Sequence, residues 1–299
     1  MQSMDGSRLV RTQQGVTKSI RATRWAELGD VVNEFSRVAM SLGAPTHFHL
    51  LNPTSEGQFF SIACADDYSA VGQAGNPCDL QTLKRVMETS PTGTTPLTEA
   101  LQQIIRLIQP GAEKINMLGQ KVVIVLATDG RPNDPNTFLR ALQELQRLPV
   151  WVVVRLCTSE EDVVSYWSDL DAQLEVPLET LDDVAGEAEE VMSKNPWLTY
   201  APSLHLARTM GLHDKLFDLL DERALLPSQA KQLIERIIGC QDLPEPEVEL
   251  QAFISAVKVV LGRQEAVYNP RTGLMAPWVN VKLLEKTIKG GSSSSCSLC

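Results

Sequence analysis

Two side chains with oxygen donors, those of Asp129 and Thr95, lie next to the ends of predicted secondary-structure elements. Asp129 ends the apolar run KVVIVLAT and opens the turn-forming segment DGRPND. Thr95 stands in SPTGTTPL, a loop that leads into a helical pattern. A carboxylate and a hydroxyl are hard oxygen donors, which suit Mg²⁺ or Mn²⁺ better than Zn²⁺. Thr95 and Asp129 are therefore the candidate metal ligands.

Both residues also have an ordinary structural interpretation. A threonine before a proline is a common helix N-cap, and Asp-Gly after a strand is a common turn. Under that interpretation Asp129 and Thr95 only stabilise their loops. The histidines His47 and His49 share one face of a predicted strand without a third ligand, so we interpret them as structural. Cys157 has no identifiable histidine to activate it and is interpreted as a core thiol.

The elements that would position these residues alternate along the first 200 residues. Apolar residues at steps of three and four predict helices, and short runs rich in valine, isoleucine and phenylalanine predict strands. Asp134 is the predicted N-cap of a helix, and Thr158 and Thr180 are predicted to open two more. The predicted order is a helix within 23–43, strands 46–52 and 58–65, a helix from about 79, a helix that begins at Pro96 and stops at Pro110-Gly111, strand 121–128, helix 135–148, strand 149–158, a helix, strand 173–179 and a helix.

This alternation indicates an α/β fold with a doubly wound, mostly parallel sheet of Rossmann-like type. In such a sheet, ligands bind at the carboxyl ends of the strands, where Asp129 is predicted to lie. Helical patterns replace the strand patterns after about Tyr200. We therefore predict an α/β domain over 1–200, a small helical domain over 201–289 and a disordered Gly/Ser/Cys tail over 290–299.

Charge and composition narrow the classes of partner. The chain has 299 residues, of which 43% are hydrophobic, and a formal net charge of −10. An acidic chain does not favour nucleic acid or adsorption to anionic lipid, so the expected partners are proteins. No apolar run is long enough for a transmembrane segment. Six cysteines without metal-type spacing and the lack of an export signal predict a cytoplasmic protein: Cys64, Cys78, Cys157, Cys240, Cys296 and Cys299.

The segments TGTTPL and VVIVLATDGRPND resemble the threonine loop and the aspartate loop of the von Willebrand factor type A (vWA) domain. The resemblance covers roughly Met1 to Tyr200. It implies a metal-ion-dependent adhesion site in which Thr95 and Asp129 are ligands. In intact relatives the resemblance implies that Mg²⁺ takes its last ligand from an acidic side chain of a partner protein.

One element of the vWA pattern is absent. The family also has an earlier strand that ends in an Asp-x-Ser-x-Ser loop, usually followed by Met, and that strand lies at the centre of its sheet. The segment DGSRL, at Asp5 to Leu9, offers an aspartate and a serine, but no apolar strand precedes it. Met1 stands where the methionine after the serine loop would be, so the expectation is that the sequence begins just after that loop. Metal binding by Thr95 and Asp129 alone is then expected to be weak or absent.

The last residues raise a second hypothesis. Cys296-Ser-Leu-Cys299 fits the four-residue prenylation pattern, with cysteine as an unusual last residue. Cys296 and Cys299 are thus lipidation candidates, and lipidation would give a peripheral membrane contact. The alternative is an unmodified, frayed end.

Enzyme signatures are missing from the sequence. It contains no Gly-x-Gly-x-x-Gly after a first strand, no phosphate-loop lysine, no Gly-x-Ser-x-Gly and no His-Glu-x-x-His. We therefore expect no enzyme but a protein-binding module of vWA type. The alternative is a doubly wound hydrolase or transferase with an unrecognised site, which a perturbed carboxylate or thiol beside a deep pocket would support.

Overall fold

The computed structural model describes residues 1–13, 16–64, 76–77, 80–173 and 178–293. The chain divides into two compact units, and each is described by itself. The first unit comprises Met1–Leu9, Ser19–Asp182 and Thr209–Gly211. The second unit comprises Val10–Lys18, Asp183–Arg208 and Leu212–Cys299.

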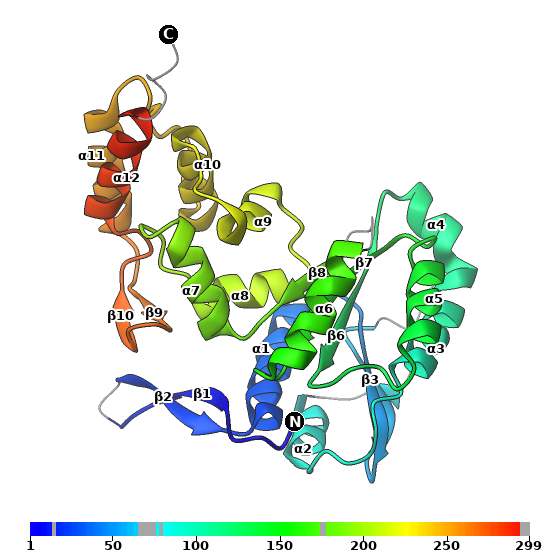
Figure 1. Cartoon of the computed structure of the whole chain (residues 1–299). Helices are drawn as coiled ribbons and strands as arrows, with labels where there is room; N and C mark the ends of the chain where they lie inside the picture. Colours follow the sequence, from blue (N-terminus) through cyan, green and yellow to red (C-terminus); the bar gives the residue numbers. More distant parts are fainter. Residues whose placement is uncertain (14–15, 65–75, 78–79, 174–177, 294–299) are drawn as a thin grey trace. The chain divides into compact units, whose positions relative to one another are not determined.

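A three-stranded parallel sheet forms the centre of the first unit (Figure 1). Its strands are β6 (Val122–Thr128), β7 (Val150–Leu156) and β8 (Leu178–Leu181), in the order β6-β7-β8. All seven residues of β7 are buried, as a strand covered on both faces requires. The register pairs Val122 with Val150 and Thr128 with Leu156, so the carboxyl ends of β6 and β7 lie together.

Helices cover one face of this sheet. The largest hydrophobic core of the unit joins inward residues of β6 and β7 to α3 (Leu97–Ile108), α5 (Pro135–Leu145) and α6 (Glu161–Gln173). Helices α3 and α5 lie against each other there (Figure 1). Asp134 is the N-cap of α5, as predicted, because its side chain accepts hydrogen bonds from the backbone N–H groups of Asn136 and Thr137. A short helix, α4 (Ala112–Met117), precedes β6.

A second, separate sheet of three strands belongs to the same unit. Its order is β3 (Thr46–Thr54), β4 (Gly57–Ile62) and β5 (Asn76–Pro77). Helix α1 (Arg24–Leu42) precedes β3 and packs against α2 (Leu80–Glu88). Gly43 ends α1 with a left-handed backbone, φ 62°, a conformation that glycine adopts without strain.

A hairpin near the start of the chain was not predicted. Strands β1 (Gly6–Arg11) and β2 (Thr17–Ala22) pair with each other. Their sequences, GSRLVR and TKSIRA, contain few apolar residues, and most of their side chains are partly or fully exposed. A polar, exposed hairpin carries little of the alternating pattern from which strands are predicted.

The second unit is mainly helical. Its core is formed by buried residues of α7 (Val184–Lys194), α9 (Lys215–Glu222), α10 (Pro227–Ile238), α11 (Leu250–Leu261) and α12 (Val281–Ser293). Helix α8 (Pro202–Thr209) lies between α7 and α9 in the sequence. The antiparallel strands β9 (Val267–Asn269) and β10 (Leu274–Ala276) form a small hairpin, which the helical prediction missed.

The buried amide of Asn195 fixes the end of α7. Its side-chain nitrogen donates to the carbonyl groups of Leu220 and Arg223 at 2.9 and 3.0 Å. Its side-chain oxygen accepts from the N–H of Leu225 at 2.9 Å. One fully buried side chain thus satisfies three backbone groups at the end of α9.

The coarse fold prediction is confirmed, since the chain has a mixed α/β architecture with a parallel sheet. By packing, the segment from Asp183 to Arg208 groups with the later helices, whereas the predicted boundary was near Tyr200. Helix α12 continues to Ser293, past the predicted end of the helical domain at 289. Within the described residues, no helix is long and apolar enough to cross a membrane.

Candidate functional site

Asp129 stands directly after β6, at the carboxyl edge of the parallel sheet. Its side chain is 34% exposed. The turn behind it is held by Thr128, a residue only 1% exposed, whose hydroxyl accepts from the N–H of Gly130 and donates to the Gly130 carbonyl, both at 3.2 Å. The backbone N–H of Cys157 donates to the Thr128 carbonyl at 2.8 Å, which ties the end of β7 to the same turn. Asp129 therefore lies in a turn whose backbone is held in place by hydrogen bonds.

Helix α6 anchors this turn from the other side. The indole N–H of Trp167, which is fully buried, donates to the Gly130 carbonyl at 3.3 Å. The guanidinium of Arg131 donates through Nε to the carbonyl of Asp162 at 3.1 Å and lies 5.6 Å from the ring centroid of Tyr166. No local pattern predicts that α6 holds the aspartate turn, because these contacts join residues more than thirty positions apart.

Thr95 lies next to the aspartate turn. A methyl group added at Gly130 would be 3.5 Å from the Thr95 hydroxyl oxygen, so the two loops are in van der Waals reach. Helix α3 begins at Leu97 and has no side-chain cap, so Thr95 does not act as the N-cap. Within the described residues the Thr95 hydroxyl makes no hydrogen bond. The two candidate ligands are thus brought together with the Thr95 hydroxyl still available.

The Thr95 loop is positioned by a residue of β3. The side-chain amide of Asn52 donates to the Thr94 carbonyl at 2.9 Å. Gly93 adopts φ 103°, and a methyl group there would be 2.2 Å from the Asn52 side-chain oxygen. Only glycine allows this conformation together with such a close approach.

The Asp129 carboxylate is already paired with a positively charged group. The ammonium group of Met1 forms an ion pair with the Asp129 carboxylate. One carboxylate that is paired with an ammonium and one neutral hydroxyl do not fit tight binding of Mg²⁺ or Mn²⁺. Those ions need several oxygen ligands in near-octahedral geometry, usually including one or two unpaired carboxylates. Weak or absent metal binding at this edge stays a prediction.

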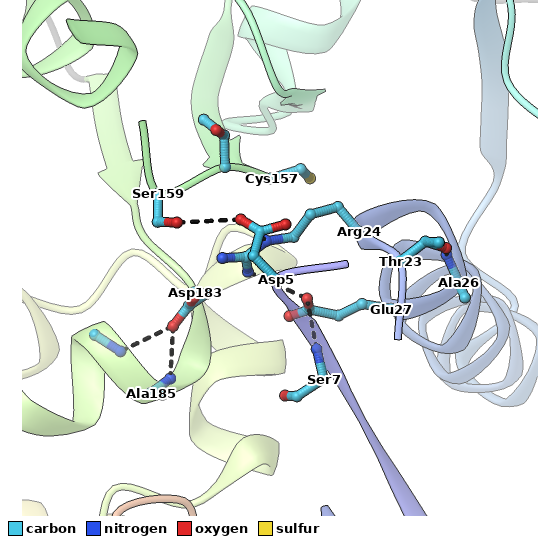
Figure 2. Close-up of polar contacts among 12 residues, drawn as sticks. Asp5, Ser7, Thr23, Arg24, Ala26, Glu27, Cys157, Ser159, Asp183 and Ala185 are labelled. Atoms are coloured by element: carbon cyan, nitrogen blue, oxygen red, sulfur yellow. Dashed lines mark hydrogen bonds and ion pairs between the residues drawn. The ribbon is translucent and has the colours of Figure 1, made fainter. Parts of the chain in front are cut away.

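Asp5, the aspartate of the DGSRL segment, lies at the same sheet edge but in a different role (Figure 2). It accepts a hydrogen bond from the Ser159 hydroxyl at 3.1 Å and forms an ion pair with Arg24 at 3.1 Å. Burial alone would raise the pKa of Asp5, but hydrogen bonds from Ser3 and Arg24 outweigh burial and lower it to about 2. Asp5 is therefore ionised at neutral pH and engaged with an arginine.

Glu27 links two buried arginines in this network. The guanidinium of Arg24 lies 3.2 Å from one oxygen of the Glu27 carboxylate (Figure 2). The guanidinium of Arg155 lies 3.6 Å from the other oxygen. The backbone N–H of Ser7 also donates to Glu27, at 3.3 Å. Arg24 and Arg155 are each only 3% exposed. Together these contacts bind the start of the chain, α1 and β7 into one ionic cluster.

Cys157 is buried at the end of β7, as predicted for a core thiol. Burial raises the pKa of the Cys157 thiol, and the nearby arginines Arg155 and Arg24 offset this only in part. The thiolate is the reactive form of cysteine, so a raised pKa makes this residue a poor nucleophile. His49, which the sequence left without a third metal ligand, packs its ring against Phe59 at 4.3 Å between centroids.

Alkylation rates test whether Cys157 is inert. With iodoacetamide at pH 8, we expect the exposed Cys64 to react at least about 100-fold faster than Cys157, which should react only on unfolding. Peptide mass spectrometry over a time course measures both rates in one sample. Comparable rates for the two cysteines would contradict the structural role and would support the enzyme alternative.

The second unit contains one group of three carboxylates. Ligand atoms of Glu187, Glu190 and Asp221 lie within 4.8 Å of one another. Arg208, however, is paired with Glu187 at 2.7 Å and with Asp221 at 2.9 Å. The guanidinium therefore already pairs with two of the three carboxylates, and we interpret the arrangement as a structural ion cluster. The lipidation candidates Cys296 and Cys299 lie outside the described residues.

No protein-family model, curated protein or solved structure matches this chain. Its function therefore has to be argued from the site itself.

Proposed function

We propose that the first unit is a protein-binding module of vWA type, doubly wound, whose recognition surface is the sheet edge around Asp129 and Thr95. The observation that supports this proposal most strongly is that the loop of Thr95 and the turn of Asp129 meet at this edge. The Thr95 hydroxyl lies beside Gly130, next to the half-buried carboxylate of Asp129. Residues displayed at the carboxyl ends of parallel strands are well placed to contact a ligand.

The chemistry of the edge favours a binding function over catalysis. Cys157, the thiol at this edge, is buried and its pKa is raised by burial, which disfavours the reactive thiolate. General acid–base or nucleophilic catalysis needs a base within hydrogen-bond reach of the reacting group. The rigid anchoring of the aspartate turn by Trp167 and Thr128 instead suits recognition, because a preorganised surface loses little entropy on binding.

We propose that metal contributes little to this recognition in a chain that begins at Met1. Titration calorimetry should give a Kd for Mg²⁺ weaker than about 1 mM, equivalent to less than about 4 kcal/mol of binding free energy. Mn²⁺ should behave in the same way. Tight binding of either ion would contradict the proposal, since one paired carboxylate cannot account for it.

The binding function is tested by the Asp129→Ala variant. Proteins captured on the immobilised chain are identified, and the affinity of the most enriched one is measured by surface plasmon resonance. Asp129→Ala should weaken that affinity at least about 10-fold, the loss expected for a contact at the centre of an interface. Chelation by EDTA should change it little.

The matched control is Glu144→Ala. Glu144 is an exposed carboxylate near the end of α5, ahead of β7 and therefore on the opposite edge of the sheet. This variant removes the same charge and should leave the affinity unchanged. Equal affinities of the Asp129→Ala variant and the unaltered chain would overturn the assignment of the recognition surface.

We also propose that the protein is cytoplasmic. The three cysteines described by the structure, Cys64, Cys157 and Cys240, are unpaired, which supports a reducing, cytoplasmic location. Lipidation at Cys296 or Cys299 would add a peripheral membrane contact, and the intact mass of the endogenous protein reports it directly.

A further inference from the structure

The loop between β7 and α6 contains an exposed serine with an acidic run behind it. Ser159 lies in this loop, and its side chain is exposed. The next three residues are also exposed, and all three are acidic: Glu160, Glu161 and Asp162. Among the described residues, none of these three carboxylates forms an ion pair with a cation. The Ser159 hydroxyl is therefore followed directly by three negative charges at the surface.

This charge pattern fits one class of modifying enzyme. Ser/Thr kinases select their substrates in part by charge, so a groove lined with lysine and arginine binds acidic residues beside the acceptor hydroxyl. A kinase with an acidic groove would instead be repelled by the same residues. The enzyme that fits Ser159 is thus an acidophilic Ser/Thr kinase.

The backbone around Ser159 can open at low cost, which matters because a kinase binds its substrate as an extended segment. Ser159 and Glu160 precede α6, which begins at Glu161. The N–H groups in the first turn of an α-helix have no partner within the helix. Opening the turn breaks two backbone hydrogen bonds to the Glu160 carbonyl and the contact of Arg131 described above. Helix ends open more easily than helix centres.

The Ser159 hydroxyl also makes a contact that a phosphate would break (Figure 2). It donates to Oδ2 of Asp5 at 3.1 Å, and the same oxygen lies 3.1 Å from Nε of Arg24. Asp5 directly precedes β1, and Arg24 is the first residue of α1. One carboxylate oxygen therefore joins the start of β1 to α1 and to the loop after β7.

A phosphate on Ser159 would compete with Asp5 for Arg24. A phosphoserine carries a charge of about −1.5 to −2 and three strong acceptor oxygens, whereas a carboxylate carries one charge and two oxygens. The phosphate would also repel the Asp5 carboxylate and would remove the hydroxyl that now donates to it. Arg24 would keep its ion pair with Glu27, at 3.2 Å. The group that leaves is therefore Asp5.

We propose that Ser159 is a phosphorylation site for an acidophilic Ser/Thr kinase, and that its phosphate displaces Asp5 from Arg24. The γ-phosphoryl group of ATP forms a bond to Ser159 Oγ while its bond to ADP breaks, and the hydroxyl proton passes to the catalytic aspartate of the kinase. The start of β1 then loses its tie to the loop after β7. This inference does not depend on the proposed binding function.

The first experiment tests the modification itself. The purified 299-residue chain is incubated with ATP, Mg²⁺ and a Ser/Thr kinase that prefers acidic peptides, and in parallel with a kinase that prefers basic peptides. Peptide mass spectrometry over a time course should place phosphate on Ser159 with the first kinase, and at least about 30-fold more slowly with the second.

The chain contains a matched control site, Ser168. Its side chain is exposed, and Asp169 and Asp171 follow it, but it lies in the middle of α6. Its phosphorylation should be at least about 30-fold slower than that of Ser159, because a helix centre opens rarely. Absence of phosphate on Ser159 in the folded chain would overturn the proposal. Equal rates at Ser159 and Ser168 would overturn it as well, since position in the fold would then play no part.

The second experiment tests the displacement of Asp5 by hydrogen exchange of the fully phosphorylated chain. The N–H of Ser7 donates to Glu27 at 3.3 Å, and peptides that contain it should exchange at least about 10-fold faster after phosphorylation. Peptides from β7 serve as the unchanged reference. In the Asp5→Asn variant the neutral amide is not repelled, so phosphorylation should leave the exchange of Ser7 unchanged. No acceleration in the unaltered chain, or equal acceleration in Asp5→Asn, would show that the phosphate does not act through Asp5.

Discussion

Replacing Glu27 with alanine should destabilise the first unit by about 3–5 kcal/mol, the range observed when one partner of a buried ion cluster is removed. The carboxylate of Glu27, whose side chain is only 10% exposed, lies within 3.2 Å of Arg24 and 3.6 Å of Arg155. The variant would leave two buried guanidinium groups with one carboxylate fewer. Urea unfolding, followed through hydrogen exchange of peptides from β7, measures the loss in this unit specifically.

Two further variants serve as comparisons for Glu27→Ala. Glu34→Ala removes a carboxylate of the same helix from an exposed pair with Arg37 and should cost at most about 1 kcal/mol. Glu27→Gln retains the shape and hydrogen-bonding oxygen of the side chain and should fall between the two. A loss for Glu27→Ala no larger than that for Glu34→Ala would show that the cluster does not stabilise the fold.

Replacing Arg208 with methionine should destabilise the second unit by a similar amount, about 3–5 kcal/mol. Arg208 is 3% exposed and contacts Glu187, Asp221 and the hydroxyl of Tyr200, the last at 3.3 Å. Methionine keeps much of the volume but leaves the buried carboxylate of Glu187 without its guanidinium. Hydrogen exchange of peptides from α11, at increasing urea concentration, measures the effect.

The control for this unit is Arg236→Ala. Arg236 pairs with Asp214 at the surface, where its side chain is 46% exposed, so its loss should cost less than about 1 kcal/mol. Equal stability of the Arg208→Met and Arg236→Ala variants would contradict the prediction. It would show that the ion pairs of Arg208 do not stabilise the second unit more than a surface pair does.

Strong local patterns were enough to predict the elements that carry the site. The helix of α1 follows from apolar residues at steps of three and four, and its stop at Gly43 follows from the special backbone of glycine. The strand of β7 was recognisable because an unbroken apolar run suits a strand covered on both faces. Asp134 acts as an N-cap because its side chain can reach two free N–H groups at the start of α5.

Other features depend on partners that no local pattern contains. Thr180 was predicted to open a helix, but it lies within β8, and Asp183 caps α7 in its place. Both residues are good caps by type, so only the packing of β8 against β7 decides between them. The meeting of Thr95 with the Asp129 turn could be anticipated from a parallel sheet, whereas the ionic cluster of Glu27 could not, because its arginines are more than 100 positions apart.

The way the chain passes between the two units limits how the protein can be shortened. The first unit includes Thr209–Gly211, which follows a long stretch of the second unit in the sequence. Thr209 accepts a hydrogen bond from Arg155 at 3.4 Å, and a methyl group added at Gly211 would be 2.5 Å from Val123. A fragment that stops at Tyr200 would therefore expose part of the sheet that these three residues cover. Excising either unit for separate expression calls for a rearranged gene, with distant segments rejoined by short linkers, and not for a single cut.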